Sequence, residues 1–403
     1  MPYSPGTPDY GDEDLLSVPS NGTIWSLNHR FICKPRNLAV GLARQIALKN
    51  VKPKKWVVKL NQGFSGKGNA CFDIQMIQNK VYKDASGCLL SGDALVNTIA
   101  DDIEQEFPNM KFECTHNTWC NHNAWCGDSS KPSFVDQMSR LGVIAEALVE
   151  GSILSSPSVQ AVIDPDIVID VLSTHEQVSN SLSSCRTFAL THCPRHQPFL
   201  MFIKVLSGQV YKGCINPAAA PYRSVIVDYA KRIGEALTKQ GVVGHFAVDF
   251  LAAKQIVDGV EKWTVTGIEI NLRQGGTTHP YSTMCILCGG HMDADGIFRT
   301  KDGKERYYEA TDSYIDTRLK GLTSSEFLQE YQTSSDPEIV KLRWNDNQKV
   351  GVVFHLLPFL EIGKIGFTAI GETSEQANCL FQGVAKMMSK IAANLPNPRD
   401  SRD

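Results

Sequence analysis

The sequence predicts a globular chain in which antiparallel β-hairpins carry the functional residues, within two or three subdomains. Its 403 residues are enough to bury a sizeable core. An apolar strand at 56–61 runs directly into a glycine-rich loop at 62–70 and then into another apolar run. About two hundred residues later, alternating strands at 245–250 and 267–272 flank Asp258-Gly259, a strong signal for a tight turn. The chain is therefore expected to contain two separate hairpins.

The second hairpin ends in side chains that bind metals and anions. Within the segment Gly267–Pro280, Glu269 and Asn271 are expected on one face of a strand, roughly 6.5 Å apart, because successive side chains alternate. Pairing about the predicted turn places Asp249 opposite Ile268 or Glu269. Two carboxylates and an amide suit Mg²⁺, which takes one or two carboxylates, water and substrate phosphates. The alternative is a structural hairpin with a solvated carboxylate face. The apolar side chains in between are expected to face a core: Ile268, Ile270 and Leu272.

The glycine-rich loop differs from the Walker phosphate-binding loop. A Walker loop leads from a strand to a helix and ends in Gly-Lys-Ser/Thr, which this loop lacks. Its glycines would instead let backbone N–H groups bend over phosphates as a flexible lid. Lys59 on the preceding strand would reach the same phosphates as a point charge. Taken alone, the pattern is also typical of an ordinary turn.

Charge and composition argue against several classes of partner. The net charge is -3 and no long block of either sign occurs, so neither a nucleic acid nor an acidic membrane surface is an expected partner. No apolar stretch approaches the roughly 20 residues that cross a bilayer, and residues 1–20 lack the pattern of a signal peptide. The twelve cysteines have no disulfide-framework spacing, which fits reduced thiols. We therefore expect a cytoplasmic protein without nucleic-acid or membrane partners.

Two cysteine clusters leave alternatives open. The segment from Cys114 to Cys126 is a near-tandem six-residue repeat with five soft ligands of the types that zinc accepts, although its spacing matches no common zinc site. A polar surface insertion with incidental thiols is the alternative. Cys285 and Cys288 have the spacing of a redox pair but lie in apolar sequence, which favours buried thiols.

The two hairpins together resemble the ATP-grasp fold, in which ATP lies between two α+β subdomains. The resemblance begins with Lys59 and its glycine loop and continues in Asp249, Glu269 and Asn271. The amino-acid sequences of several segments are similar to those of the pheganomycin-type peptide ligases: 57–69, 156–160, 172–177, 208–211 and 269–280. The similarity extends from about residue 37 to about residue 388. It implies an ATP- and Mg²⁺-dependent carboxylate–amine ligase, which forms peptide or amide bonds through an acyl phosphate.

The resemblance assigns roles to individual residues. It gives Asp249, Glu269 and Asn271 to Mg²⁺ or Mn²⁺, and Lys59 to catalysis at the ATP phosphates. Arg273 would stabilise the acyl phosphate or hold the substrate carboxylate in a bidentate geometry that Lys cannot copy; the alternative is a surface salt bridge. The residues implied to bind ATP, besides Lys59, lie in the loop and in a hinge: Gly63, Ser65, Gly66, Gly68, Glu146, Ala147, Val149 and Glu150.

The implied substrates are small-molecule carboxylates and amines or peptides. His175, Gln177 and His279 are polar residues on motif segments and are expected to contact substrate, with hydrogen bonding in the core as the alternative. The relatives usually carry an acid for the ribose hydroxyls where Ile153 stands, and Glu150 is the candidate substitute.

The resemblance also divides the chain. Residues 1–36 are expected to form a poorly ordered arm, 37–149 the small lid subdomain and 150–395 the C-terminal subdomain with the metal site. The domain that precedes the ATP-grasp fold in complete ligases is expected to be largely missing. The alternative function is therefore a noncatalytic ATP-binding module or a truncated pseudoenzyme. An irregular stretch at about 179–205 is either a retained intron or a domain-specific insertion.

Overall fold

The computed structural model describes residues 35–48, 55–64, 67–74, 77, 80–106, 113–114, 140–147, 149, 151–179, 211–257 and 259–394. The N-terminal arm up to residue 34 and the irregular stretch from residue 180 lie outside them, as do Ser65, Gly66, Glu150 and the cysteine cluster beyond Cys114. The described elements are helices and antiparallel sheets, so the predicted α+β fold class is confirmed. None of the described helices is both long and apolar enough to span a membrane. The predicted domain boundaries stay predictions.

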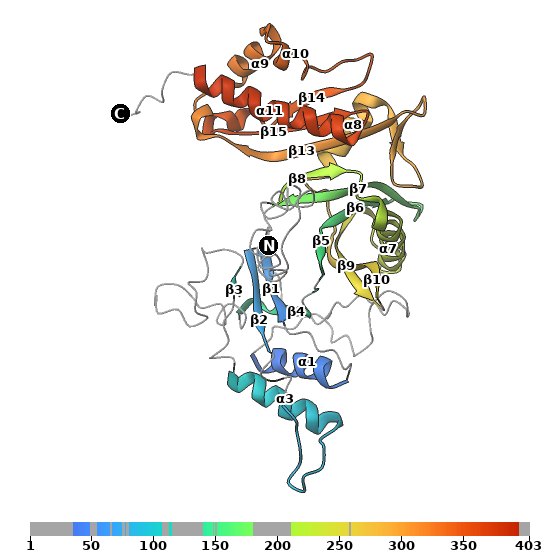
Figure 1. Cartoon of the computed structure of the whole chain (residues 1–403). Coiled ribbons are helices and arrows are strands. Elements are labelled where there is room, and N and C mark those ends of the chain that lie inside the picture. Colours follow the sequence, from blue (N-terminus) through green and yellow to red (C-terminus); the bar gives the residue numbers. More distant parts are fainter. Residues whose placement is uncertain are drawn as a thin grey trace, which may run out of the picture.

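A four-stranded sheet with two helices on one face forms the N-terminal part of the described fold (Figure 1). Helices α1 (Pro35–Leu48) and α3 (Gly92–Glu106) cover this small sheet. Its strands follow the order β3-β2-β1-β4, with these bounds: β1 Lys55–Phe64, β2 Lys67–Asp73, β3 Glu113–Cys114 and β4 Val143–Ala147. The predicted succession of strand, loop and strand is confirmed by the antiparallel pairing of β1 with β2.

The alternation of side chains along β1 decides what each face of the small sheet contacts. Trp56, Val58 and Leu60 point toward the helices and share a core with residues of α3 at helical spacing: Val96, Ile99, Ala100 and Ile103. Val57 and Lys59 therefore point to the opposite face of the sheet. That face is turned toward the rest of the protein.

The C-terminal part is an eleven-stranded antiparallel sheet, which we call the large sheet. Its main path runs β10-β9-β6-β7-β8-β13-β12-β11, and β5, β14 and β15 pair at its margins. The strands have these bounds: β5 Ile153–Ser155, β6 Pro157–Ile163, β7 Ile169–Ser179, β8 Tyr211–Asn216, β9 Gly244–Val257, β10 Val260–Asn271, β11 Gly290–Met292, β12 Phe298–Thr300, β13 Glu305–Ile315, β14 Gly351–His355 and β15 Lys364–Gly371.

Helices cover both faces of the large sheet. Phe367 and Ala369 of β15 share a core with α11 (Ser374–Asn394), whereas Ile370 shares one with α8 (Thr278–Cys288), so these two helices lie on opposite faces. Helix α7 (Ala220–Thr238) packs on β6, β7, β9 and β10. The remaining described elements are short: α9 Ser324–Thr333, α10 Pro337–Val340 and the 3₁₀ turns η2 Thr317–Leu319 and η3 Leu357–Ile362.

The hairpin of β9 and β10 has the predicted register, in which Asp249 lies opposite Glu269. Phe246, Val248 and Phe250 of β9 pack against α7, so the alternating Asp249 points to the other face. The expectation that Ile270 and Leu272 face a core is wrong: their exposed fractions are 39% and 57%. The reason is that β10 is the edge strand, and a bulge between Gly267 and Glu269 changes its side-chain alternation.

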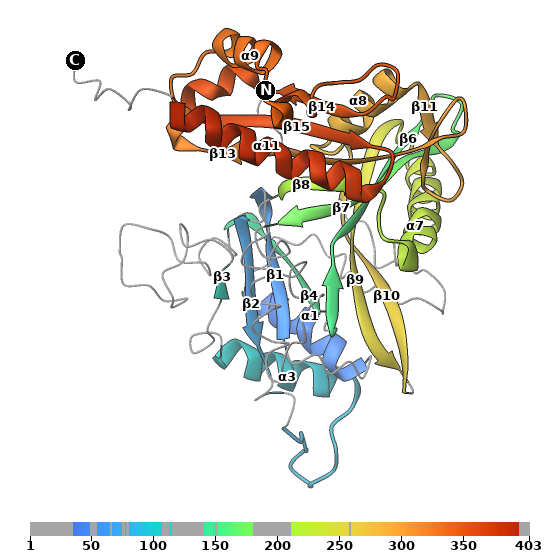
Figure 2. The same cartoon turned by 45° about the horizontal axis from the view of Figure 1, so that its top comes forward.

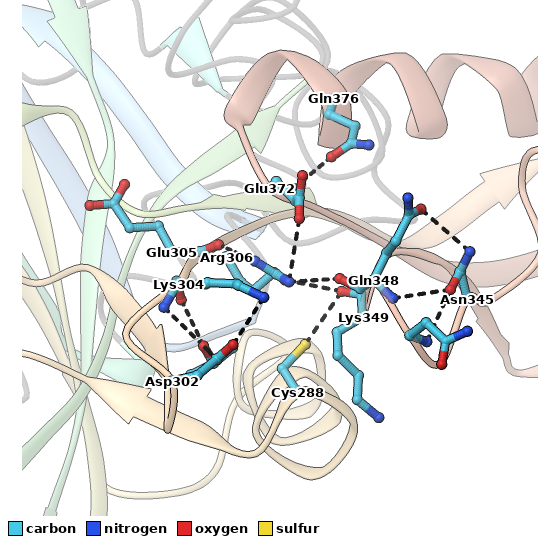
Figure 3. Close-up of polar contacts among 12 residues, drawn as sticks. Cys288, Asp302, Lys304, Glu305, Arg306, Asn345, Gln348, Lys349, Glu372 and Gln376 are labelled. Atoms are coloured by element: carbon cyan, nitrogen blue, oxygen red, sulfur yellow. Dashed lines mark hydrogen bonds and ion pairs between the residues drawn. The ribbon is translucent and has the colours of Figure 1, made fainter.

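A buried arginine fixes the corner where α8, β13 and the turn before β14 meet (Figure 3). Arg306 is 2% exposed and donates to the backbone carbonyls of Glu305, Gln348 and Lys349 at 2.7, 2.6 and 3.2 Å. Its guanidinium also lies 3.6 Å from a carboxylate oxygen of Glu372. This fork of donors satisfies carbonyls that would otherwise be buried without partners. As predicted for a thiol in apolar sequence, Cys288 at the end of α8 is buried, and Cys285 is half-buried.

The small and large sheets meet through an apolar cluster, which we call the inter-sheet cluster. It joins Val57 and Cys71 of the small sheet to Leu154, Leu251 and Ala253 of the large sheet, with Val149 and Ile268 packed against its margin. Figures 1 and 2 both show β1 of the small sheet beside β5 of the large sheet. The face of β1 that carries Lys59 is therefore turned toward the face of β9 that carries Asp249.

Candidate functional site

Charged residues continue the inter-sheet cluster along the strands that form it. On β1, Val57 of the cluster is followed on the same face by Lys59. On β9, Leu251 of the cluster shares its face with Asp249, two residues earlier. One region thus places a buried apolar cluster beside a cation and a group of oxygen atoms.

Lys59 links the two sheets directly. Its Nζ lies 2.7 Å from Oε2 of Glu146 on β4 and donates to the backbone carbonyl of Ile268 on β10 at 3.2 Å. Ile268 precedes Glu269, one of the predicted metal ligands. The predicted phosphate-binding lysine therefore lies next to the strand that carries the predicted metal ligands.

Asp249 is the centre of a polar group on the large sheet. Gln177 of β7 donates from Nε2 to Oδ1 of Asp249 at 2.7 Å, and Asn271 of β10 donates from Nδ2 to Oδ2 at 3.1 Å. Arg273 donates from its terminal nitrogen to Oδ1 of Asn271 at 3.0 Å. Three of the predicted site residues are thus connected with Gln177, for which substrate contact was predicted.

Burial raises the pKa of Asp249 to about 6. Loss of hydration is the largest cause, and the neighbouring charge of Glu269 adds to it. Hydrogen bonds from Ser158 and Asn271 and the charge of Arg273 act in the opposite direction. The site therefore holds two carboxylates whose mutual repulsion a cation would relieve.

The donor chemistry fits Mg²⁺. Two carboxylates and an amide lie on facing strands, as suits a cation that keeps water and phosphate oxygens among its ligands. In the described part of the chain, no group of three or more His, Cys, Asp or Glu side chains could hold a metal, and the present set has only two carboxylates. Oδ1 of Asn271 accepts a hydrogen bond from Arg273, which engages one of its two lone pairs and places a positive guanidinium beside the oxygen that a cation would use.

Sequence reasoning gave no role to Gln160, which holds the turn that follows Arg273. Gln160 lies on β6 and is 2% exposed. Its Nε2 donates to Oγ1 of Thr277 at 2.6 Å, and its Oε1 accepts from Oγ1 of Thr278 at 2.9 Å. The available signal was a polar side chain in the otherwise apolar run Val159–Ile163, and only the fold could supply its partner 117 residues away.

The predicted histidines lie in different surroundings. His175 is on the face of β7 that carries Gln177, but it is 0% exposed, and neither ring nitrogen has a hydrogen-bond partner among the described residues. Burial lowers its pKa to about 3. This placement favours a core histidine over a substrate contact. His279 is exposed at the start of α8, and its ring meets that of His355 edge-on with centroids 4.4 Å apart.

The remaining described residues that were predicted to bind ATP lie on β1, β2 and β4 or just after β4. Gly63 is the residue before the last of β1, and Gly68 is the second residue of β2. Ala147 pairs with Trp56 at the end of β4, and Val149 packs against the cluster. Ile153 stands on β5 and pairs with Lys254.

Comparison with known proteins finds a relative over part of the chain. No family model matches the chain. Over 175 residues the chain is 31% identical to an L-propargylglycine–L-glutamate ligase of Streptantibioticus cattleyicolor, a match that covers 43% of this chain and 29% of the relative. The predicted resemblance to ATP-grasp peptide ligases is confirmed. The match spans less than a third of the length of that ligase.

Solved structures with a related arrangement are more distant. An N5-carboxyaminoimidazole synthase of Aspergillus clavatus, in complex with ADP and a ribonucleotide, is 12% identical with a TM-score of 0.40, over 91% of this chain and 69% of that chain. The biotin carboxylase domain of a Hydrogenobacter thermophilus 2-oxoglutarate carboxylase, in complex with MgADP, is also 12% identical with a TM-score of 0.37, over 86% and 58%.

Proposed function

We propose that the chain is an ATP- and Mg²⁺-dependent carboxylate–amine ligase that acts through an acyl phosphate. The observation that carries the proposal is the hydrogen bond from Lys59 to Ile268, because it joins the predicted phosphate-binding strand to the predicted metal-binding strand. The similarity to a ligase of L-propargylglycine and L-glutamate supports amino acids as the class of substrate.

The inter-sheet cluster and its charged continuation match the two ends of a nucleotide. The apolar side chains of Val57, Leu251 and Val149, which pack between the two sheets, would line a purine that enters between them, and backbone groups of β4 would bind its edge. From there the triphosphate would extend toward Lys59 and toward a cation held by Asp249, Glu269 and Asn271. A bound Mg²⁺ would neutralise phosphate charge during transfer.

The chain's own residues would then act on the substrate. Arg273 is exposed on the Asn271 side of the site and can present two parallel donors to a carboxylate or an acyl phosphate. Binding of such an anion would draw Arg273 away from Asn271, which removes a like charge from beside the cation. Arrival of substrate and completion of the metal site are thereby coupled in this proposal.

The test is ADP formation by the purified chain with MgATP and pools of amino acids as acid and amine. We expect formation that requires both substrates and that falls at least about a hundredfold in Glu269→Gln and Lys59→Ala, as expected for loss of a charged group at a transition state. Glu261→Gln on the same hairpin and Lys80→Ala on the small-sheet side are matched controls, since both residues are exposed and lie away from the site.

Two outcomes would contradict the proposal. MgATP binding, seen as a thermal shift, without any substrate-dependent ADP would indicate a nucleotide-binding module instead. Equal activity in Glu269→Gln and Glu261→Gln would show that the carboxylates of β9 and β10 do not hold the catalytic cation.

A further inference from the structure

Gln160 makes paired hydrogen bonds to two consecutive hydroxyl groups. Thr277 is the N-cap residue of α8 and Thr278 is its first residue. The amide of Gln160 donates to the hydroxyl of Thr277 at 2.6 Å and accepts from that of Thr278 at 2.9 Å. A primary amide has a donor, its NH₂ group, and an acceptor, its carbonyl oxygen. Both are used here, so the two bonds fix the orientation of the amide. Its own exposure of 2% means that water does not compete for them.

The bonds from Gln160 extend into the turn between Arg273 and α8. Oγ1 of Thr278, which donates to Gln160, also accepts the backbone N–H of Gly275 at 3.0 Å, and the N–H of Thr278 donates back to the carbonyl of Gly275 at 3.1 Å. A Cβ built on Gly275 would lie 3.5 Å from Nε2 of Gln160 and 3.8 Å from a guanidinium nitrogen of Arg273. Gln160 and Arg273 therefore approach the same point of the turn.

The sheet leaves space for the turn to reach Gln160. Across the strands, Gln160 pairs with Ala247 of β9, and Ala247 pairs with Asn271 of β10. The small methyl group of Ala247 lies between the two amide side chains, so the chain after Asn271 can fold back over it. On the other side of the turn, a Cβ on Gly276 would lie 3.0 Å from the ring of Tyr211. This distance is shorter than an ordinary van der Waals contact, so the ring of Tyr211 would have to move to admit a side chain there.

We propose that Gln160 is the positioning residue of the substrate end of this site. By fixing the 273–278 turn, it sets the direction in which Arg273 and the first N–H groups of α8 meet an anionic group of the acid substrate. The inference rests on the proposed function for the identity of that anion, whereas the fixing of the turn stands on the hydrogen bonds alone. Gln160 would act through the turn, to which it is hydrogen-bonded, and is not itself one of the predicted metal ligands.

Hydrogen exchange of the 272–279 segment in the full chain tests the positioning without any need for turnover. Gln160→Met keeps the length of the side chain but removes both bonds, so exchange at the amide of Gly275 should accelerate by about tenfold or more, the factor for loss of about 1.4 kcal/mol of local protection. Ser173→Ala is the matched control. Ser173 lies on β7 opposite Gln160 of β6, and its buried hydroxyl has no hydrogen-bond partner among the described residues. Unchanged exchange in Gln160→Met would overturn the proposal.

Steady-state kinetics separate positioning from general stability. In Gln160→Met the KM for the acid should rise by about tenfold to a hundredfold while the KM for MgATP stays unchanged, as a misplaced contact predicts. An equal rise in both, or none, would overturn the proposal. If the wild type shows no turnover, the proposed function fails, and hydrogen exchange alone decides whether Gln160 fixes the turn.

Gln160→Glu provides a conservative rescue. A protonated carboxyl has one donor and one acceptor, like the amide, whereas the ionised form has no donor for Thr277. Burial favours the protonated form, so exchange at Gly275 should return toward the wild-type rate as pH is lowered, after correction for intrinsic rates. Gln160→Met should show no such return. A parallel response of the two variants would also overturn the proposal.

Discussion

Asp249 shows how function and stability conflict in a single residue. Its carboxylate is buried beside a second carboxylate, and its raised pKa measures the cost of keeping it ionised. Four neutral or positive neighbours reduce that cost: Ser158, Gln177, Asn271 and Arg273. The hydrogen bond from Gln177, at 2.7 Å, is shorter than the 3.1 Å bond from Asn271, so Gln177 should contribute more to the folded state without a cation.

Gln177→Met is expected to destabilise the protein by about 1 to 3 kcal/mol, because it leaves a buried carboxylate without one of its donors. Urea unfolding at neutral pH measures the change. The exposed Gln329→Met on α9 is the matched control and should shift stability by no more than about 0.5 kcal/mol. Equal effects of the two substitutions would show that the 2.7 Å bond to Asp249 contributes nothing.

At the scale of elements, local patterns in the sequence predicted the β9–β10 hairpin correctly. The Asp258-Gly259 turn and the alternation of the strands were sufficient to place Asp249 opposite Glu269. They were not sufficient for Ile270 and Leu272, because the position of β10 at the edge of the sheet depends on the order of distant strands. A one-residue bulge is likewise decided by packing and leaves no local signal here.

Contacts between distant segments account for most of what the sequence did not reveal. The bonds from Gln160 to Thr277 and from Lys59 to Ile268 join residues 117 and 209 positions apart. Resemblance to a family brought Lys59 and the β10 residues into one site, but it assigned nothing to Gln160. The burial of His175 also depends on neighbouring strands. The residues next to His175 in the sequence do not show whether its side chain is buried.

The corner held by Arg306 gives a prediction about elements. Arg306→Lys should lower the free energy of unfolding by about 2 to 4 kcal/mol. A single ammonium group cannot replace the planar guanidinium that bonds three carbonyls, so the buried cation would lose hydrogen-bond partners. Arg318→Lys makes the same chemical change at a side chain that is 57% exposed and should cost no more than about 0.5 kcal/mol. Urea unfolding compares them, and similar values for both would contradict the structural role of the corner.

At the scale of the whole molecule, the inter-sheet cluster is the main apolar contact between the two halves of the candidate site. Leu251 is buried there against Val57 of the small sheet. Leu251→Ala should therefore cost about 2 to 4 kcal/mol and weaken MgATP binding, since the purine surface loses a side chain. Leu272→Ala, at an exposed position of the same hairpin, is the control. If Leu251→Ala lowered stability without changing the affinity for MgATP, the purine would not bind at the inter-sheet cluster.

The final prediction concerns how the whole protein responds to acid. Burial lowers the pKa of His175 to about 3 and that of His355 to about 4, in the second case with help from the charge of His279. In the unfolded chain both histidines take up protons as the pH falls below about 6.5. In the folded chain they do so only at lower pH, because their pKa values are lowered. Their contribution to stability is therefore complete above pH 6.5 and is lost as pH falls toward 4.

Asp249 acts in the opposite direction, because its pKa of about 6 is raised and its ionised form weakens the folded state as pH rises from about 4 through 6. Two lowered histidines outweigh one raised carboxyl, so stability from these groups should decline between pH 6.5 and 4. Replacement by His355→Leu removes one of the titrating histidines, and its unfolding free energy should fall less steeply over that range, by up to about 3 kcal/mol. Urea unfolding at several pH values measures both slopes. Parallel slopes would mean that His355 is hydrated and titrates normally in the folded protein.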